Sequence, residues 1–166
     1  MYTENVEIPE GVTIDAKKST AKVKGKNGEL ERKFNKKVNI KVNGKSVEII
    51  SEEKALVGTV RTHIKNMVVG VMEGHEKKMK INYAHFPMSV EVKGKVIIIK
   101  NFIGEKSPRM VKVVGDTKVQ VKGQEITITG SDKDAVGQTA ANLVTGTRIR
   151  NKDSRIFQDG IYLLNE

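Results

Sequence analysis

An internal repeat restricts how this chain can fold more than any other feature of its sequence. Residues 40–64 superimpose on residues 119–143 without a gap, and the matching positions are mostly aliphatic residues and glycines. The matched pairs are Ile40 and Val119, Val42 and Val121, Gly44 and Gly123, Val47 and Ile126, Ile49 and Ile128, Lys54 and Lys133, Val57 and Val136, Gly58 and Gly137, and Ile64 and Leu143. We call the shift that carries Ile40 onto Val119 the repeat offset. Upstream, Gly28 and Glu29 correspond to Gly104 and Glu105 at a slightly different offset. A duplicated module of about eighty residues is the simplest explanation.

Each copy has the pattern of a hairpin followed by a helix. In the first copy "KVNGKSVEII", residues 41–50, alternates apolar and polar residues around Asn-Gly, the strongest short hairpin signal. Ser51 is a candidate helix N-cap, and Ser131 is its counterpart in the second copy. The helix that follows Ser51 has an apolar face formed by Leu56, Val60, Ile64, Met67, Val68 and Val71. The sequence therefore predicts an α+β fold of two tandem duplicated modules, each a small, mainly antiparallel sheet with one helix packed on it.

We place the boundary between the modules near "NYAHFPM", residues 82–88, because Pro87 interrupts the strand patterns there and no helical period survives. The prediction is an N-terminal α+β module over residues 1–81 and a C-terminal α+β module over residues 82–166. Gly146 is a candidate end for the second helix. The segment after it has no counterpart in the first copy, so we look there for a specialised function.

The charge balance favours a polyanionic partner. Thirty Lys and Arg against twenty Asp and Glu leave a net charge of +10 and a sequence pI near 9.7. No segment approaches the roughly 18 consecutive apolar residues of a membrane span, so nucleic acid is favoured over a membrane. The absence of cysteine excludes disulfides, thiolate catalysis and finger-type zinc sites. The first residues have no secretory pattern, and we expect a cytoplasmic protein.

The motifs of common enzymes are missing. No nucleotide-binding glycine loop is complete, and His63, His75 and His85 lack the spacing of a zinc helix. We therefore expect no enzymatic activity, no metal, no cofactor and no small-molecule substrate. "GKNG", residues 25–28, fits a G-x-x-G loop that clamps RNA, but its strand-like flanks make a hairpin turn the better interpretation.

Four of the six arginines, Arg109, Arg148, Arg150 and Arg155, fall in the second half of the chain. A planar guanidinium pairs bidentately with phosphate, so this distribution favours docking on RNA. Surface ion pairs of these arginines with Asp153 and Asp159 are the alternative. The aromatic residues are few and scattered, which favours a protein that contacts the backbone of structured RNA over one that stacks on single-stranded bases.

Several motifs, in this order, resemble one known family. They are "EIPEGVTI" at residues 7–14, "VKGKNGELERKF" at 23–34, "YAHFPM" at 83–88, "FIGEK" at 102–106 with an arginine after it, and "NKDSRIFQDGIY" at 151–162. Together they resemble the archaeal and eukaryotic branch of the L-six family of large ribosomal subunit proteins. The C-terminal "RIFQDGIYLL", residues 155–164, is similar to the family signature Arg-x-Phe-x-Asp-Gly-aliphatic-Tyr-aliphatic. One departure is Glu166, where the family commonly has a basic residue.

The resemblance implies a structural, non-catalytic constituent of the large ribosomal subunit. It implies binding to large-subunit ribosomal RNA, mainly through the second module, near the factor-binding centre, the sarcin-ricin loop and the stalk base, with neighbouring ribosomal proteins as further partners. The expected RNA-binding residues are Lys106, Arg109, Arg148, Arg150, Lys152 and Arg155. The expected structural residues are Phe157 and Tyr162, which would anchor the tail, Gly160, which would permit a tight turn, and Asp159. A stand-alone RNA-binding or ribosome-assembly factor is the alternative function.

Overall fold

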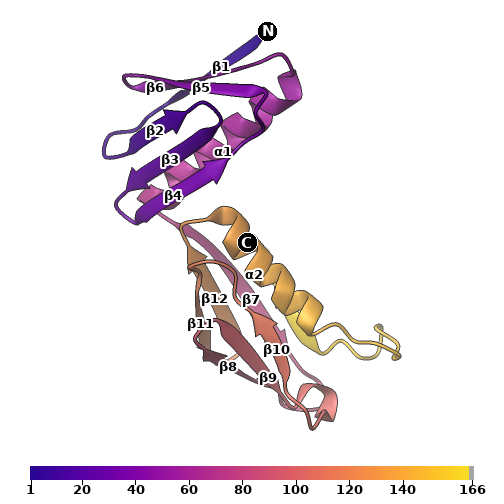
Figure 1. The fold of residues 1–166 in the computed structure, drawn as a ribbon. Coiled ribbons are helices and arrows are strands. Elements are labelled where there is room, and N and C mark those ends of the chain that lie inside the picture. The colour runs from indigo at the N-terminus through magenta and orange to yellow at the C-terminus, as the bar shows by residue number, and fades with distance from the viewer. Residues whose placement is uncertain (165–166) are drawn as a thin grey trace. The chain divides into compact units, whose positions relative to one another are not determined.

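The computed structural model of the protein describes residues 1–164 and divides into two compact units (Figure 1). The first unit contains residues 1–75 and 131–133, and the second contains residues 76–130 and the described chain from residue 134. Glu166, the one departure from the family signature, lies outside the described residues. Each unit has sheets and one long helix, which confirms the predicted α+β class of two tandem modules.

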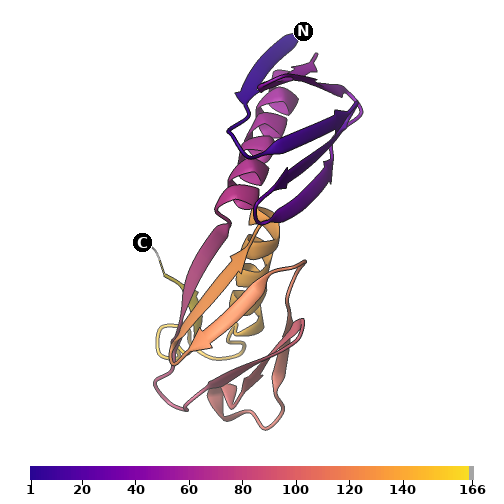
Figure 2. The same ribbon diagram turned by 90° about the vertical axis from the view of Figure 1, so that its left-hand side faces the viewer.

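The first unit contains two three-stranded antiparallel sheets and one helix. One sheet has the order β1-β6-β5 and the other the order β2-β3-β4. The strands are β1 (Tyr2–Glu7), β2 (Thr13–Lys17), β3 (Thr20–Gly25), β4 (Gly28–Lys33), β5 (Val38–Asn43) and β6 (Ser46–Ser51), and the helix is α1 (Lys54–Met72). Figure 2 shows α1 lying along the sheets of this unit. The "GKNG" segment is the turn between β3 and β4, as predicted.

Aliphatic side chains fill the core of the first unit. Alternate residues of the strands, such as Val47 and Ile49 on β6, are fully buried, because one face of each sheet is turned toward the helix. The helix contributes Val57, Val60, Ile64, Met67, Val68 and Val71 to this core. The predicted apolar face of the helix is confirmed, except that Leu56 is only half-buried and Val57 is buried instead.

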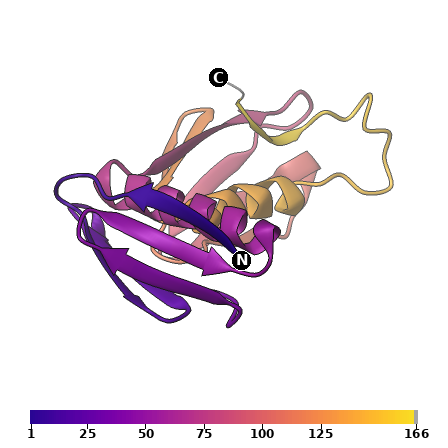
Figure 3. The same ribbon diagram turned by 90° about the horizontal axis from the view of Figure 1, so that it is seen from above.

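The second unit repeats this plan and adds a strand. Its four-stranded sheet has the order β11-β12-β7-β13, and its three-stranded sheet has the order β10-β9-β8. The strands are β7 (His75–Asn82), β8 (Ser89–Lys93), β9 (Val96–Lys100), β10 (Arg109–Lys112), β11 (Lys118–Lys122), β12 (Glu125–Gly130) and β13 (Gly160–Leu163), with the short helix η1 (Phe102–Gly104) and the helix α2 (Lys133–Gly146). Figure 3 shows the chain leaving α2 in a long loop and returning as β13.

The predicted duplication is confirmed element by element. The repeat offset carries the first residues of β6 and α1, Ser46 and Lys54, onto the first residues of β12 and α2. The matched hairpin turns share even their backbone conformation, because Gly44 and Gly123 both have a φ of +59°. This left-handed conformation is one that glycine adopts without strain. The predicted end of the second helix at Gly146 is also confirmed.

One detail of the first unit differs from the sequence prediction. Ser51 is not the N-cap of α1, because β6 runs through Ser51 and the helix begins only at Lys54, after Glu53. The buried Ser51 hydroxyl accepts a hydrogen bond from the Glu53 N–H at 3.3 Å and donates one to the Lys37 carbonyl at 3.1 Å. Residues 82–88, near which the sequence places the module boundary, lie in the second unit and run from the last residue of β7 to the start of β8. Whether residues 76–81 fold with the first module stays a prediction.

Candidate nucleic-acid interface

Three loops of the second unit meet at the end where α2 finishes. They are residues 83–88 between β7 and β8, residues 101–108 between β9 and β10, and residues 147–159 between α2 and β13. We call this region the loop end. Figures 1 and 2 show the long loop after α2 and the η1 segment at this same end of the unit. All six predicted RNA-binding residues lie on two of these loops or directly after one of them.

Asp159 joins the last loop to the first. Its side chain is only 2% exposed, and its Oδ1 accepts a hydrogen bond from the Ala84 N–H at 3.2 Å. The same oxygen lies 3.4 Å from Nδ1 of His85, whose ring stacks on Phe157 with 4.9 Å between the ring centroids. Oδ2 of Asp159 is buried and makes no hydrogen bond within residues 1–164. These contacts hold the final loop against residues 83–88.

The middle loop is tied to residues 83–88 as well. The side-chain amide of Asn101 donates a hydrogen bond to the Pro87 carbonyl at 2.8 Å. Asn101 and Ile103 have positive φ angles of 58° and 51°, and Asn151 in the final loop has a φ of 60°. Residues other than glycine are rarely held in this left-handed conformation, and where they are, the surrounding structure must fix them. The loop end is therefore built to a defined shape.

Arg109 connects the middle loop to the end of α2. Its guanidinium forms two hydrogen bonds with the Glu105 carboxylate, at 2.8 and 2.6 Å. It also donates to the carbonyls of Gly146, at 2.9 Å, and Arg148, at 3.2 Å, and lies 4.4 Å from the centroid of the Phe102 ring. The hydrogen bonds from Arg109 hold the pKa of the Glu105 carboxyl below its usual value. Arg109 thus has a structural role inside the protein.

Within residues 1–164, Arg155 has one acidic partner. Its side chain is 88% exposed and binds the Asp153 carboxylate, with Nη2 of Arg155 2.9 Å from Oδ2 of Asp153. These hydrogen bonds hold the pKa of the Asp153 carboxyl below its usual value and raise the pKa of Arg155. Of the two surface ion pairs considered from the sequence, the one with Asp153 forms, whereas Asp159 binds Ala84 and His85. An exposed pair of this kind contributes little to stability.

The remaining four predicted cations are exposed on the same two loops. Lys106 lies on the middle loop, and Arg148, Arg150 and Lys152 lie on the final loop. None of the four forms an ion pair in the part of the chain that the structure describes, although the Lys152 ammonium lies 4.9 Å from the centroid of the Phe157 ring. Their charges are therefore available to an anionic partner.

Sequence comparisons with known proteins show similarity to one family. The sequence model of the family described as Ribosomal protein L6 matches residues 8–74 and 86–160. The chain is 47% identical over 168 residues to the large ribosomal subunit protein uL6 of Methanosarcina mazei, covering 97% of this chain and 95% of the relative. It is 48% identical to the uL6 of Methanobrevibacter smithii, with 98% and 95% covered, and 50% identical to that of Methanosphaera stadtmanae, with 99% and 93% covered.

This chain belongs to the ribosomal protein L6 family. The first matched segment of the family model lies in the first unit, and the second lies in the second unit apart from residues 131–133. The resemblance that the short motifs indicate is thus confirmed over nearly the whole chain.

The residues of the family signature have roles that the sequence only partly predicted. Gly160 begins β13 with a φ of +157°, a region that only glycine adopts readily, and its expected role in a tight turn stays a prediction. Tyr162 is exposed, but its hydroxyl donates a hydrogen bond to the Gln158 carbonyl at 3.0 Å, which braces the chain across Gly160. Phe157 is only half-buried and stacks on His85. If it anchors the tail as expected, it does so with less buried surface than a fully buried ring would have.

His85 and Asn101 hold the loops together, a role that the sequence did not indicate for either residue. Both contact partners that are distant in sequence, since His85 stacks on Phe157 near the end of the chain and Asn101 binds Pro87 in another loop. Only the presence of His85 within the "YAHFPM" motif could have marked it. No pattern of the sequence pairs Asn101 with Pro87.

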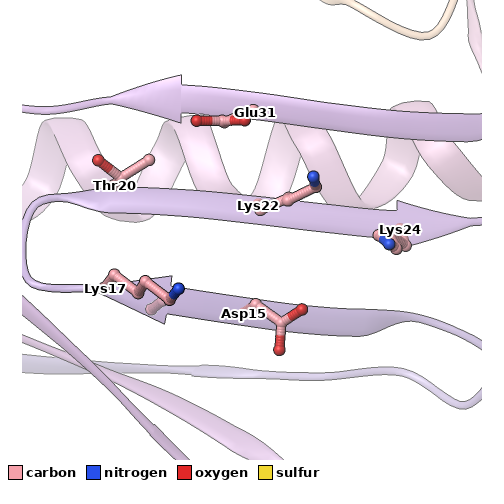
Figure 4. Close-up of a pocket in the computed structure, with 7 residues that line it drawn as sticks. Asp15, Lys17, Thr20, Lys22, Lys24 and Glu31 are labelled. Carbon is pink, nitrogen blue, oxygen red and sulfur yellow. The ribbon is translucent and has the colours of Figure 1, made fainter.

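The first unit presents a different surface, which is shown in Figure 4. A shallow hollow of about 690 Å³ lies on the sheet β2-β3-β4 and is lined by Asp15, Ala16, Lys17, Thr20, Lys22, Lys24 and Glu31. In the strand register Lys22 lies between Asp15 on β2 and Glu31 on β4. It also pairs with Glu29, which lies 3.2 Å from the Lys24 ammonium. The lysines of this hollow are therefore balanced by carboxylates.

No group of three or more histidine or acidic side chains within residues 1–164 is arranged to hold a metal ion. None of the described helices is both long and apolar enough to cross a membrane.

Proposed function

We propose that the chain is a structural constituent of the large ribosomal subunit and binds large-subunit ribosomal RNA through its loop end. The single observation that carries the proposal is the set of exposed cations on loops of fixed shape. Lys106, Arg148, Arg150 and Lys152 lie on two loops that Arg109 and Asp159 tie to the rest of the unit. Arg155 adds a guanidinium whose only ion-pair partner within residues 1–164 is Asp153.

The fixed shape of the loops gives these cations a specific use. A protein that neutralises several phosphates releases the counterions of RNA, which drives binding without reading bases. When the loops are already ordered, little conformational entropy is lost on binding, so the same contacts give a higher affinity. The planar guanidinium groups of Arg148, Arg150 and Arg155 can each bind one phosphate with two hydrogen bonds. The surface therefore fits the backbone of a folded RNA.

Membership of the family supports a location in the ribosome. The relatives are named as proteins of the large ribosomal subunit, and the motif resemblance points to a location near the factor-binding centre, the sarcin-ricin loop and the stalk base. On this proposal the protein is a non-catalytic component of cytoplasmic ribosomes, with ribosomal RNA and neighbouring large-subunit proteins as partners.

Sedimentation of ribosomes tests the proposal against the alternative of a stand-alone RNA-binding or assembly factor. A tagged chain should remain in large subunits in a one-to-one ratio after a high-salt wash, whereas an assembly factor should be absent from mature subunits. The double variant Arg148→Glu and Arg150→Glu should lose its place in the subunits, because the added carboxylates repel phosphate. The matched variant Lys36→Glu and Lys41→Glu changes two exposed lysines of the first unit and should be retained. Equal retention of both variants would refute the loop end as the RNA-binding surface.

A further inference from the structure

We propose that the open edge of β1 in the first unit pairs with an extended segment of another protein, in the position that β13 fills in the second unit. The segment presents an aliphatic side chain toward α1 and a basic side chain toward Glu7. The inference rests on the internal duplication of the fold and does not depend on the loop end.

The duplication shows that β1 and β7 occupy the same position in their sheets. The Ile8 N–H donates a hydrogen bond to the Lys45 carbonyl at 2.8 Å, and the Ile81 N–H donates one to the Gln124 carbonyl at 2.7 Å. The two acceptors are equivalent, because the repeat offset carries Lys45 onto Gln124. In the first unit β1 is the last strand of its sheet, whereas in the second unit β13 lies on the outer side of β7.

The backbone of β1 has hydrogen-bonding groups that point away from its sheet. Residues of an antiparallel strand alternate between facing the partner strand and facing away from it. The bond from Ile8 and the register of Val6 with Val47 place the N–H and C=O groups of Thr3, Asn5 and Glu7 on the outer side of β1. Within residues 1–164 no strand pairs with that side.

The equivalent groups of β7 are the ones that β13 uses. The Leu164 N–H donates a hydrogen bond to the Lys78 carbonyl at 3.0 Å, and Tyr162 lies opposite Lys80. The spacing from Ile8 to Ile81 places Lys78 and Lys80 at the positions of Asn5 and Glu7. The pairing of β13 with β7 therefore shows how an added strand would pair with the equivalent edge of β1.

The first unit also has room for the side chain that such a strand brings. In the second unit Ile161 of β13 is only 1% exposed, and its N–H donates to the hydroxyl of Thr147 at 3.1 Å. The repeat offset carries Val68 of α1 onto Thr147, so Val68 occupies the matching place in the first unit. There a hollow of about 470 Å³ lies along the outer side of β1, lined by Asn5, Val6, Glu7, Pro9, Arg61, Lys65, Val68 and Val69.

The chemistry of this edge selects another protein as its occupant. RNA lacks the alternating amide donors and acceptors that a strand edge requires, and Glu7 is the charged side chain on the outer face of β1. A second copy of this chain would bring the Glu7 side chains of both β1 strands into one short ladder, which like charges disfavour. Pro9 has no N–H and limits the pairing to a few residues. A short segment with an aliphatic residue over Val68 and a basic residue opposite Glu7 satisfies these requirements.

Titration of a peptide into the isotope-labelled full chain tests the proposal by NMR. The probe is a blocked peptide with the sequence of residues 158–164 that carries Tyr162→Lys, so that a lysine faces Glu7. We expect amide shifts in residues 3–7 and 65–69 and slower hydrogen exchange at Asn5 and Glu7. Asn5→Pro removes one outward N–H without removing a bond to β6 and should weaken binding about tenfold. Asn5→Ala keeps that N–H and should bind like the parent.

Four outcomes would overturn the proposal. The first is equal peptide binding by the Asn5→Pro and Asn5→Ala variants, and the second is amide shifts confined to the second unit. The third is amide shifts of residues 3–7 that depend on protein concentration without peptide. The fourth is the same amide shifts when an RNA hairpin is added. The third would indicate self-association and the fourth an RNA site. Melting temperatures of both variants close to that of the parent establish that the comparison is made on folded protein.

Discussion

The two units share the same arrangement of hairpins and helix but differ in the loops at one end. The difference indicates which parts of the duplicated fold could change without disturbing its core. In the first unit β3 and β4 are joined by a short turn, Lys26 and Asn27, whereas the longer segment 101–108 separates β9 from β10 in the second. The second unit also has the long loop after α2 and the added strand β13. The hairpins and helices that form the cores keep the repeat offset. Packing has held the cores constant while the loops have diverged.

Net charge does not separate the two units, but the arrangement of charge does. Residues 1–75 have fourteen Lys and Arg against ten Asp and Glu, and residues 76–166 have sixteen against ten. On the sheet β2-β3-β4 lysines alternate with carboxylates across the strands, as for Lys22 between Asp15 and Glu31. At the loop end, cations such as Arg148 and Arg150 form no ion pair within the described chain. On our proposal the second unit binds RNA because of where its unpaired cations lie, and not because of its net charge.

The largest expected effect concerns where the first unit ends. A fragment of residues 1–82 should be folded over residues 2–72, because that segment contains its own strands, helix and core. Residues 76–82 should be disordered in it, since β7 pairs with β12 and β13 of the second unit. Heteronuclear NMR of the fragment measures both. Dispersed, slowly exchanging amides in residues 76–82 would instead support the boundary predicted from the sequence.

The next effect concerns the added strand. Ile161→Ala should lower the free energy of unfolding of the second unit by about 2 to 5 kcal/mol, because the side chain is fully buried and leaves a cavity. The first unit has no such residue and should be unaffected. Urea unfolding followed by NMR signals of each unit measures the two separately. Leu163→Ala, at an exposed position of the same strand, is the control, and an equal loss in both variants would contradict the account.

A smaller loss is expected from Arg109→Ala. The side chain is 28% exposed and binds Glu105 and the carbonyls of Gly146 and Arg148, so its removal should cost about 1.5 to 3 kcal/mol. Arg109→Lys should not restore stability, because a lysine cannot span these partners. Arg150→Ala, at an exposed position of the same end, should stay within about 0.5 kcal/mol of the parent. Thermal unfolding compares the stabilities of the three variants. An Arg109→Ala variant as stable as the parent would show that these hydrogen bonds do not stabilise the loop end.

The smallest effect is a pH dependence. The pKa of Glu105 is held below its ordinary value of 4.5 by the hydrogen bonds from Arg109. A carboxyl with a lowered pKa in the folded state stabilises the protein above its ordinary pKa, and this contribution is lost as the pH falls through the folded value. The difference in melting temperature between the parent and Arg109→Ala should therefore shrink below pH 4.5. An NMR titration in which Glu105 has the same pKa in both proteins would contradict this.

The repeated core could be predicted from the sequence because its signals are local. Alternating residues around Asn43-Gly44 and the three-to-four spacing from Val60 to Val71 specify a hairpin and a helix by themselves. The same signals recur at the repeat offset, so the tandem α+β architecture follows from pattern alone. Ser51 is of a residue type that is common at helix N-caps. Its prediction as the N-cap is wrong only because the strand before it continues further than the pattern shows.

The geometry of the loop end could not be predicted, because its contacts join residues far apart in sequence. Asp159 binds the N–H of Ala84, 75 residues away, and no composition or period relates the two. The sequence analysis grouped Arg109 with the arginines expected to bind RNA, although its donors bind a carboxylate and two carbonyls of the protein. Only the close spacing of Glu105 and Arg109 was available as a hint, since Arg148 lies much later in the chain.

The most direct test of the account is the affinity of two matched variants for a large-subunit ribosomal RNA fragment that contains the sarcin-ricin loop. One variant replaces four cations of the loop end, Lys106, Arg148, Arg150 and Lys152, with alanine. The other replaces four exposed lysines of the first unit, Lys26, Lys36, Lys41 and Lys45, and so removes the same charge. We predict that only the first variant binds weakly, with the slope of log affinity against log salt reduced by about 3. Equal losses of affinity and slope in both variants would show that RNA senses only net charge, and would contradict the assignment of binding to the loop end.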